Sequence, residues 1–248
     1  MGFRLVPSAV RVAAIGLLLT LTGCVTVPPQ QSYNREANSQ IKTIRVLPMR
    51  ASETGLFFNN PAMQFGLVGA LIAAGDMAAK RSTLEKNLIA AHFDHEAIFK
   101  ARFTEAMQHR GYTLLWPTPI SEGKINKAPR EGWGVRKTYM AVEQADAQLD
   151  VNFGFIGYAA SGAGKAAPYR PTVSMSARLV SADGKSKLFS ETLNYNPLFI
   201  VSADSISISP DPSYAYPNFS DLEKSGPASA EGLKAAVEAV ADKIAEQL

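Results

Sequence analysis

The residue with the clearest chemical role is Cys24, the only cysteine in the 248-residue chain. Its thiol is the one strong nucleophile available for alkylation, because the thiolate is the reactive form of the group. The residues before it, Leu21-Thr22-Gly23, end in small side chains that would let a peptidase reach the backbone. Residues 12–21 form an uncharged apolar run, which is typical of an export signal and shorter than the ~20 residues of a membrane span. We expect cleavage before Cys24 and modification of its thiol.

The segment Leu21-Thr22-Gly23-Cys24 resembles the lipobox of bacterial lipoproteins, an aliphatic residue and a small residue followed by Gly or Ala and then Cys. The resemblance implies a signal peptide of residues 1–23 and a lipid bilayer as partner, through Cys24 acylated with fatty acids such as palmitate. Two or more acyl chains anchor a protein stably. Residue 25 is Val rather than Asp, which under the sorting rule of Gram-negative envelopes implies the outer membrane. The domain would face the periplasm, although exposure on the cell surface is a second possibility. An alternative to the lipobox is a plain signal peptide followed by an ordinary buried cysteine.

The charge of the mature chain argues against nucleic acid as a partner. Removal of residues 1–23 deletes Arg4 and Arg11 and no acidic residue, so the formal net charge falls from +3 to +1. Proteins that bind nucleic acids usually carry a basic patch. With its one cysteine lipidated, the chain has neither a disulfide nor a thiolate metal site, and we expect no cofactor.

Histidines and acids in His92-Phe93-Asp94-His95-Glu96 form the best candidate for metal chemistry. His92, His95 and Glu96 offer ligand types that zinc accepts. The order matches neither H-E-x-x-H nor its inverted form, and a turn leading into a helix capped by Asp94 explains the same residues. We therefore expect that these residues bind no metal ion and that the protein is not an enzyme. A periplasmic metal-dependent hydrolase is kept as an alternative.

The helices and strands of the chain are predicted from the spacing of apolar residues and from the positions of Pro and Gly. Residues 24–40, rich in Pro, Gln, Ser and Asn, predict a flexible tether. Strands are expected at residues 41–49, 112–116, 149–158, 172–180 and 187–195. Helices are expected at residues 63–91, 94–110, 136–147 and from 229 to the end, with long irregular segments at 117–135 and 197–227.

Apolar side chains at regular spacing predict which faces are buried. One strand face is expected from Leu149, Val151, Phe153 and Phe155, a second from Val173, Met175, Ala177 and Leu179, and a helix stripe from Leu233, Val237, Val240, Ile244 and Leu248. Asp183-Gly184 is a turn dipeptide between two of the strands. The order of elements predicts a single two-layer α/β domain over residues 41–248, with helices packed on a mixed β-sheet.

The layout resembles one group of envelope proteins. The lipobox, the strand Ile41-Lys-Thr-Ile-Arg-Val-Leu-Pro, the helix and strand Glu105-Ala-Met-Gln-His-Arg-Gly-Tyr-Thr-Leu-Leu, and the strand entry Ala145-Asp-Ala-Gln-Leu-Asp-Val carry the likeness. The group includes curli-secretion-type lipoproteins, lipoprotein activators of penicillin-binding proteins, and the N-terminal domain of the TolB translocation protein. The resemblance implies an interaction role in the envelope. The Gly/Ala-rich helix and the segment 197–227 depart from the pattern.

Two sets of residues are candidates for contacts with a partner. Gly66, Gly69 and Gly75 lie in an apolar Gly/Ala-rich helix, where small residues let another helix approach closely, although a buried core helix explains them too. Tyr214, Tyr216 and Phe219 are aromatic residues in a Pro-rich segment that could anchor a partner or pack on their own domain. The expected function is an interaction or assembly role with an envelope protein or a second copy of the chain. A small-ligand or glycan carrier is a further alternative.

Overall fold

Seven strands and the helices beside them account for most of the residues that the structure describes. This computed structural model describes residues 29–50, 52–58, 66–117, 129–131, 134–162, 165–198 and 204–248, with the backbone alone for residues 66–75. The elements are β1 (Thr43–Val46), β2 (Thr54–Phe58), α1 (Gly66–Ala90), α2 (His95–His109), β3 (Thr113–Leu115), β4 (Ala147–Ala160), β5 (Arg170–Ser181), β6 (Lys187–Tyr195), β7 (Ile206–Ile208), the 3₁₀ turn η3 (Pro212–Tyr214), α4 (Phe219–Lys224) and α5 (Pro227–Gln247).

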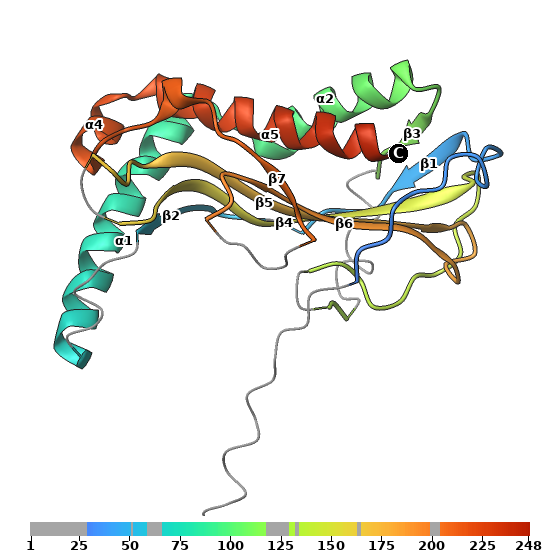
Figure 1. The fold of residues 1–248 in the computed structure, drawn as a ribbon, viewed down its shortest axis with the longest axis horizontal. Helices are drawn as coiled ribbons and strands as arrows, with labels where there is room; N and C mark the ends of the chain where they lie inside the picture. The colour runs from blue at the N-terminus through green and yellow to red at the C-terminus, as the bar shows by residue number, and fades with distance from the viewer. Residues whose placement is uncertain are drawn as a thin grey trace, which may run out of the picture.

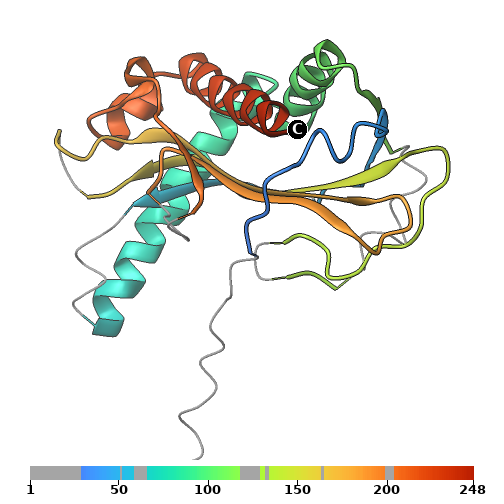
Figure 2. The same cartoon turned by 45° about the vertical axis from the view of Figure 1, so that its right-hand side comes forward.

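The strands form one mixed sheet, as the order of elements predicts. The sheet order is β3-β1-β4-β5-β6-β7, and β2 pairs with β4 beyond the end of β1. The pairs β1–β3, β1–β4, β2–β4 and β6–β7 are parallel, whereas β4–β5 and β5–β6 are antiparallel. Helices α2 and α5 cover one face of the sheet (Figures 1 and 2). The predicted two-layer α/β class is confirmed.

The core lies between α5, α2 and the sheet. The predicted α5 stripe is confirmed, because Leu233, Val237, Val240 and Ile244 are fully buried and Leu248 is 1% exposed. The predicted β5 face also lines this core, with Val173, Met175, Ala177 and Leu179. The turn between β5 and β6 contains Gly184 at φ +75°, a left-handed conformation that glycine adopts without steric cost.

Helix α2 begins and ends where its sequence indicates. The Asp94 carboxylate accepts hydrogen bonds from the backbone N–H groups of Glu96 and Ala97, so it caps the helix. Phe99, Phe103 and Met107 are the buried residues of its apolar face. The chain then turns at Gly111, at φ +84°, into β3.

Three local predictions are wrong. Residues 136–147 are not a helix, because their backbone groups bond elsewhere: the N–H of Val142, for example, donates to the carbonyl of Ala182. Residues 54–58 lie outside the strands that the sequence predicts, yet they form β2, which pairs with β4 from Thr54 to Phe58. A bulge between Phe153 and Phe155 shifts the β4 register. Ile156 therefore joins the core in place of Phe155.

Residues 29–40 lie against the domain, although the sequence predicts a flexible tether up to residue 40. Gln31 and Ser190 exchange two backbone hydrogen bonds of 2.8 and 2.9 Å at the edge of β6. The side-chain oxygen of Gln30 accepts from the N–H of Thr192, and Arg35 donates to the carbonyl of Leu248. The attached part of the chain therefore begins near residue 30. Residues 24–28 lie outside the described residues.

The sheet face away from α2 and α5 is polar but buried. Ser174, Ser176 and Arg178 on β5 lie beside Thr192 and Asn194 on β6, and all five are at most 5% exposed. Ser176 and Thr192 share a hydrogen bond of 3.3 Å across the two strands. Successive residues of these strands thus place apolar side chains on one face of the sheet and polar side chains on the other, and the side chains on both faces are buried.

Candidate functional site

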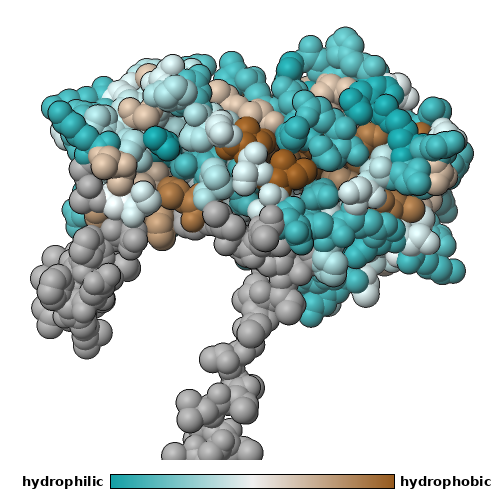
Figure 3. Space-filling view, in the orientation of Figure 1, coloured by the Kyte–Doolittle hydropathy of each residue, from teal (hydrophilic) through white to brown (hydrophobic). Residues whose placement is uncertain are grey.

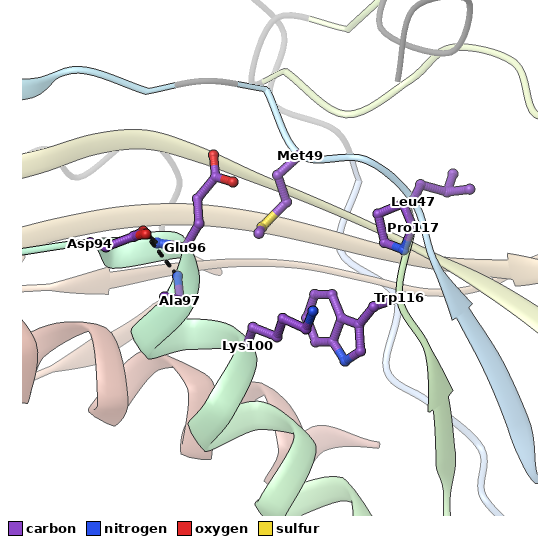
Figure 4. A pocket seen from close by; sticks show the side chains of 8 residues that line it. All are labelled: Leu47, Met49, Asp94, Glu96, Ala97, Lys100, Trp116 and Pro117. Carbon is purple, nitrogen blue, oxygen red and sulfur yellow. Dashed lines mark hydrogen bonds between the residues drawn. The ribbon is translucent and has the colours of Figure 1, made fainter. Parts of the chain in front are cut away.

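A pocket lies at the carboxyl ends of the parallel strands β1 and β3, beside the first turn of α2. The register pairs Arg45 with Leu115, so both strands end at the same edge. The crevice outside the carboxyl ends of parallel strands is the usual ligand site of α/β sheets. Here it encloses about 240 Å³. Its lining, drawn in Figure 4, is Leu47, Met49, Asp94, Glu96, Ala97, Lys100, Trp116 and Pro117.

The pocket wall combines apolar surface with charge. Two carboxylates and one ammonium group line it, from Asp94, Glu96 and Lys100. The Asp94 carboxylate already occupies the first N–H groups of α2 at 3.0 Å, so the helix end offers few free donors to an anion. The arrangement suits an apolar group or a side chain with a positive end.

Trp116 is held in place by two contacts. Its indole Nε1 donates to Thr104 Oγ1 at 3.0 Å, and the Lys100 ammonium lies 5.6 Å from the ring centroid. A cation over an aromatic face at this distance is attracted by the ring quadrupole. These contacts hold the indole as one wall of the pocket, and Figure 4 shows it beside the Lys100 side chain.

The three residues predicted as metal candidates, His92, His95 and Glu96, lie in different environments. His95 packs edge-on against Phe153, with ring centroids 5.5 Å apart. Its Nε2 is buried without a hydrogen-bond partner, and burial lowers its pKa, partly opposed by the Asp94 charge. His92 sits in the turn after α1 at φ +51°, whereas Glu96 lines the pocket. Within the described residues, no three His, Cys, Asp or Glu side chains are placed to hold one metal ion.

The aromatic candidates pack on their own domain. Tyr216 lies 5.6 Å from the ring of Tyr158, and Phe219 lies 6.2 Å from the ring of Tyr169. Tyr214 is so close to α5 that a Cβ on Gly232 would lie 2.9 Å from its ring. All three candidates are half-buried. The packing alternative therefore describes their position, and their role toward a partner stays a prediction.

The remaining site predictions concern the N-terminus and α1. Leu21, Thr22, Gly23 and Cys24 lie outside the described residues. Gly66, Gly69 and Gly75 all fall in the first ten residues of α1, where the structure describes the backbone. Of the helices in the described ranges, none combines the length and apolar character that crossing a bilayer requires.

Sequence reasoning missed a buried ionic cluster on the polar face of the sheet. Asp150 on β4 is fully buried and Arg136 is 2% exposed. The Arg136 guanidinium binds the Asp150 carboxylate, which also accepts the backbone N–H of Arg136 at 2.6 Å and the Tyr139 hydroxyl at 3.1 Å. Burial raises the pKa of Asp150, and the neighbouring guanidinium opposes that shift.

A second ion pair extends this cluster. Arg178 donates to both carboxylate oxygens of Glu131 and to the carbonyl of Arg136. Hydrogen bonding from Arg178 lowers the pKa of Glu131. The signal that could have revealed the cluster is an acid within the apolar strand Leu149-Asp150-Val151, because a buried carboxylate needs a partner. The cluster fastens Glu131 and residues 136–139 to the sheet, which is a structural role.

Comparison with known proteins adds little to these observations. No protein-family model matches the chain, and neither does any curated protein. Among solved structures, the lipoprotein GNA1162 from Neisseria meningitidis is similar over 62% of this chain and 81% of its own, with 15% identity and a TM-score of 0.26. A likeness at that TM-score supports no argument about function, which therefore has to come from the residues of this chain.

Proposed function

We propose that this protein is an envelope lipoprotein, held on the outer membrane by acylated Cys24, whose domain binds another envelope protein without catalysing a reaction. The observation that carries the proposal is the segment Leu21-Thr22-Gly23-Cys24 after an apolar run, with the only cysteine of the chain at its end. Lipid on this thiol contributes ~0.8 kcal/mol for each buried methylene.

The attachment of Gln31 to β6 supports a short connection between lipid and domain. Gln31 is fixed by its two backbone hydrogen bonds to Ser190. Gln31 lies seven positions after Cys24, and this stretch spans at most about 25 Å when fully extended. The domain would therefore stay close to the bilayer surface rather than reach far across the periplasm.

The pocket beside α2 supports the binding of a protein. Ligand sites for small molecules usually enclose about 300–1,000 Å³, and this pocket of about 240 Å³ is smaller. It is large enough for one side chain of a partner. Its apolar wall at Met49 and Trp116 fits an apolar side chain of a partner.

Mass spectrometry of the mature N-terminus tests the anchor. We expect a chain that begins at Cys24 and carries the mass of a diacylglyceryl group. Cys24→Ala should leave an unprocessed, unlipidated precursor. An unmodified thiol, or cleavage at another bond, would refute the lipoprotein assignment.

Site-specific crosslinking tests the interaction. A photoreactive residue at Lys100, on the exposed rim of the pocket, should give a discrete adduct in intact envelopes. The matched control is the same residue at Ile89, which is 74% exposed at the far end of α1. Equal adducts from both positions, or none from Lys100, would argue against a partner at the pocket.

A further inference from the structure

Helix α1 extends well beyond the sheet. Its C-terminal part packs on the domain, where Leu84 and Leu88 are 1% and 3% exposed and contribute to a core cluster with Leu222 and Leu233. Its N-terminal part continues past the sheet, on the side away from α2 and α5 (Figures 1 and 2). The end that begins at Gly66 thus projects from the domain.

The projecting end of α1 is uncharged and apolar. Residues 66–75 read Gly-Leu-Val-Gly-Ala-Leu-Ile-Ala-Ala-Gly, and Asp76 is the first charged residue of the helix. Ten helical residues are about 15 Å long, which is about half of the ~30 Å hydrocarbon core of a bilayer. The end is too short to cross a membrane but long enough to enter one leaflet.

Charged residues begin where an inserted helix would leave the hydrocarbon. Asp76 and Lys80 form an ion pair of 2.5 Å one turn apart, with side chains 48% and 27% exposed. Arg81 follows, paired with Glu53 and Glu85. Charges of this kind are costly inside a bilayer and are favourable in the headgroup region.

The described chain also begins on the side of the sheet toward which α1 projects. Residues 29–31 lie on that side, opposite α2 and α5, in both views (Figures 1 and 2). If Cys24 carries lipid, the connection of about 25 Å or less from Gln31 keeps this side toward the bilayer. The anchor and the apolar end of α1 would then reach the same surface.

The visible surface of the described domain is mostly hydrophilic. The face drawn in Figure 3 is largely teal, with hydrophobic residues in a patch near its centre and in smaller areas elsewhere. In the part of the chain whose side chains are described, the exposed large hydrophobic residues are Phe57, Ile89 and Met140. A run of ten apolar residues at the end of a projecting helix therefore stands out from the rest of the molecule.

We propose that the end of α1, residues 66–75, inserts into the membrane leaflet in which the Cys24 lipid is anchored and fixes the orientation of the domain there. The inference rests on the proposed lipid anchor, because the anchor is what brings this end to the membrane. A bilayer is favoured over a second copy of the chain, since the short N-terminal connection already determines which surface α1 faces.

The test uses the lipidated protein in vesicles of phosphatidylethanolamine and phosphatidylglycerol. Because the only native cysteine is Cys24, a Leu71→Cys variant can be labelled specifically with an environment-sensitive fluorophore once Cys24 is acylated. Ile89→Cys, at the exposed opposite end of the same helix, is the matched control. Thermal unfolding of each labelled protein checks that the fold is kept.

The expected result is a blue-shifted Leu71 probe that a nitroxide on the lipid acyl chains quenches severalfold more than the Ile89 probe. A water-soluble quencher should show the reverse preference. Equal quenching at both positions in a lipidated protein would overturn the insertion and leave the anchor intact. A protected Leu71 probe without lipid quenching, but with energy transfer between copies, would overturn it in favour of self-association. Mass spectrometry of the same sample reads the anchor separately, and an unacylated Cys24 would overturn both proposals.

Discussion

Replacement of Arg136 by methionine should destabilise the domain strongly, because it leaves a buried carboxylate without its cation. Arg136 and Asp150 are 2% and 0% exposed at their side chains. The variant loses the charged hydrogen bonds to Asp150 and the donor to the carbonyl of Pro48 at 2.8 Å. Breaking a buried ion pair on one side typically costs about 3–5 kcal/mol.

The loss of stability in Arg136→Met depends on which partners Asp150 keeps. Asp150 keeps the backbone N–H of residue 136 at 2.6 Å and the Tyr139 hydroxyl at 3.1 Å, so it is not wholly unpaired. Loss of both partners in Arg136→Met/Asp150→Leu should recover most of the cost, because apolar residues of similar volume replace buried pairs well. A residual loss of about 1–3 kcal/mol is expected from the Tyr139 hydroxyl and the freed backbone N–H.

Urea unfolding of the two single variants, the double variant and the wild type measures this coupling. The control is Arg102→Met, which removes a two-point ion pair of 2.7 and 2.9 Å with Asp242. Arg102 and Asp242 are 41% and 36% exposed, so that variant should cost at most about 1 kcal/mol. A coupling energy below about 1 kcal/mol for Arg136 and Asp150 would refute the reasoning.

Three further predictions concern the core, the sheet and pH. Val240→Asp puts a charge into a fully buried site and should abolish the cooperative thermal transition, as followed by circular dichroism. Gly157→Ala places a Cβ 1.8 Å from the carbonyl oxygen of Gly55, whereas a Cβ at Gly111 meets nothing within 4 Å. In urea unfolding, Gly157→Ala should therefore lower the free energy of unfolding by about 1–3 kcal/mol more than Gly111→Ala does. Burial lowers the pKa of His95 from 6.5, so the unfolded state protonates first and the stability present above that pH is lost below it. His95→Gln should therefore weaken the fall in unfolding free energy between about pH 7 and about pH 5, and an unchanged fall would contradict this account.

The parts of the fold that the sequence predicts well are those specified by local patterns. The stripe on α5, the cap at Asp94 and the turn at Gly184 each depend on residues within one or two turns of chain. Their physical causes are side-chain periodicity, N-cap hydrogen bonding and the freedom of glycine at positive φ. Each is visible without knowledge of distant partners.

The parts that the sequence misses depend on distant partners. Residues 136–147 have the composition of a short helix, but the Arg136 N–H binds Asp150 and the Val142 N–H binds Ala182. Strand β2 forms because Gly55 and Gly157 allow a close approach to β4. A bulge near Phe153 reverses which residues of β4 face the core. Such contacts override local propensity, and one sequence does not reveal them.

The candidate site shows the same division. The sequence indicates the residues of the α2 cap, including Asp94 and Glu96, but not that Met49 and Trp116 complete a pocket with them. Those two residues follow β1 and β3 in the chain, and the parallel pairing of these strands has no local signature in the sequence. The histidines attract attention by type alone, and burial of His95 against Phe153 explains its position without a ligand.

The register of the sheet also constrains the order in which the chain can assemble. The meander β4-β5-β6 pairs segments that are close in sequence, whereas Ile44 pairs with Ala147 and Gln31 with Ser190. Closing such long loops costs more conformational entropy, so the central hairpins are expected to form first. The residues around Gln31 would then pair with the edge of β6 last. If Cys24 carries lipid, the free connection between the anchor and the folded part of the domain would be longest before residues 29–31 dock on β6 and would shorten when they do.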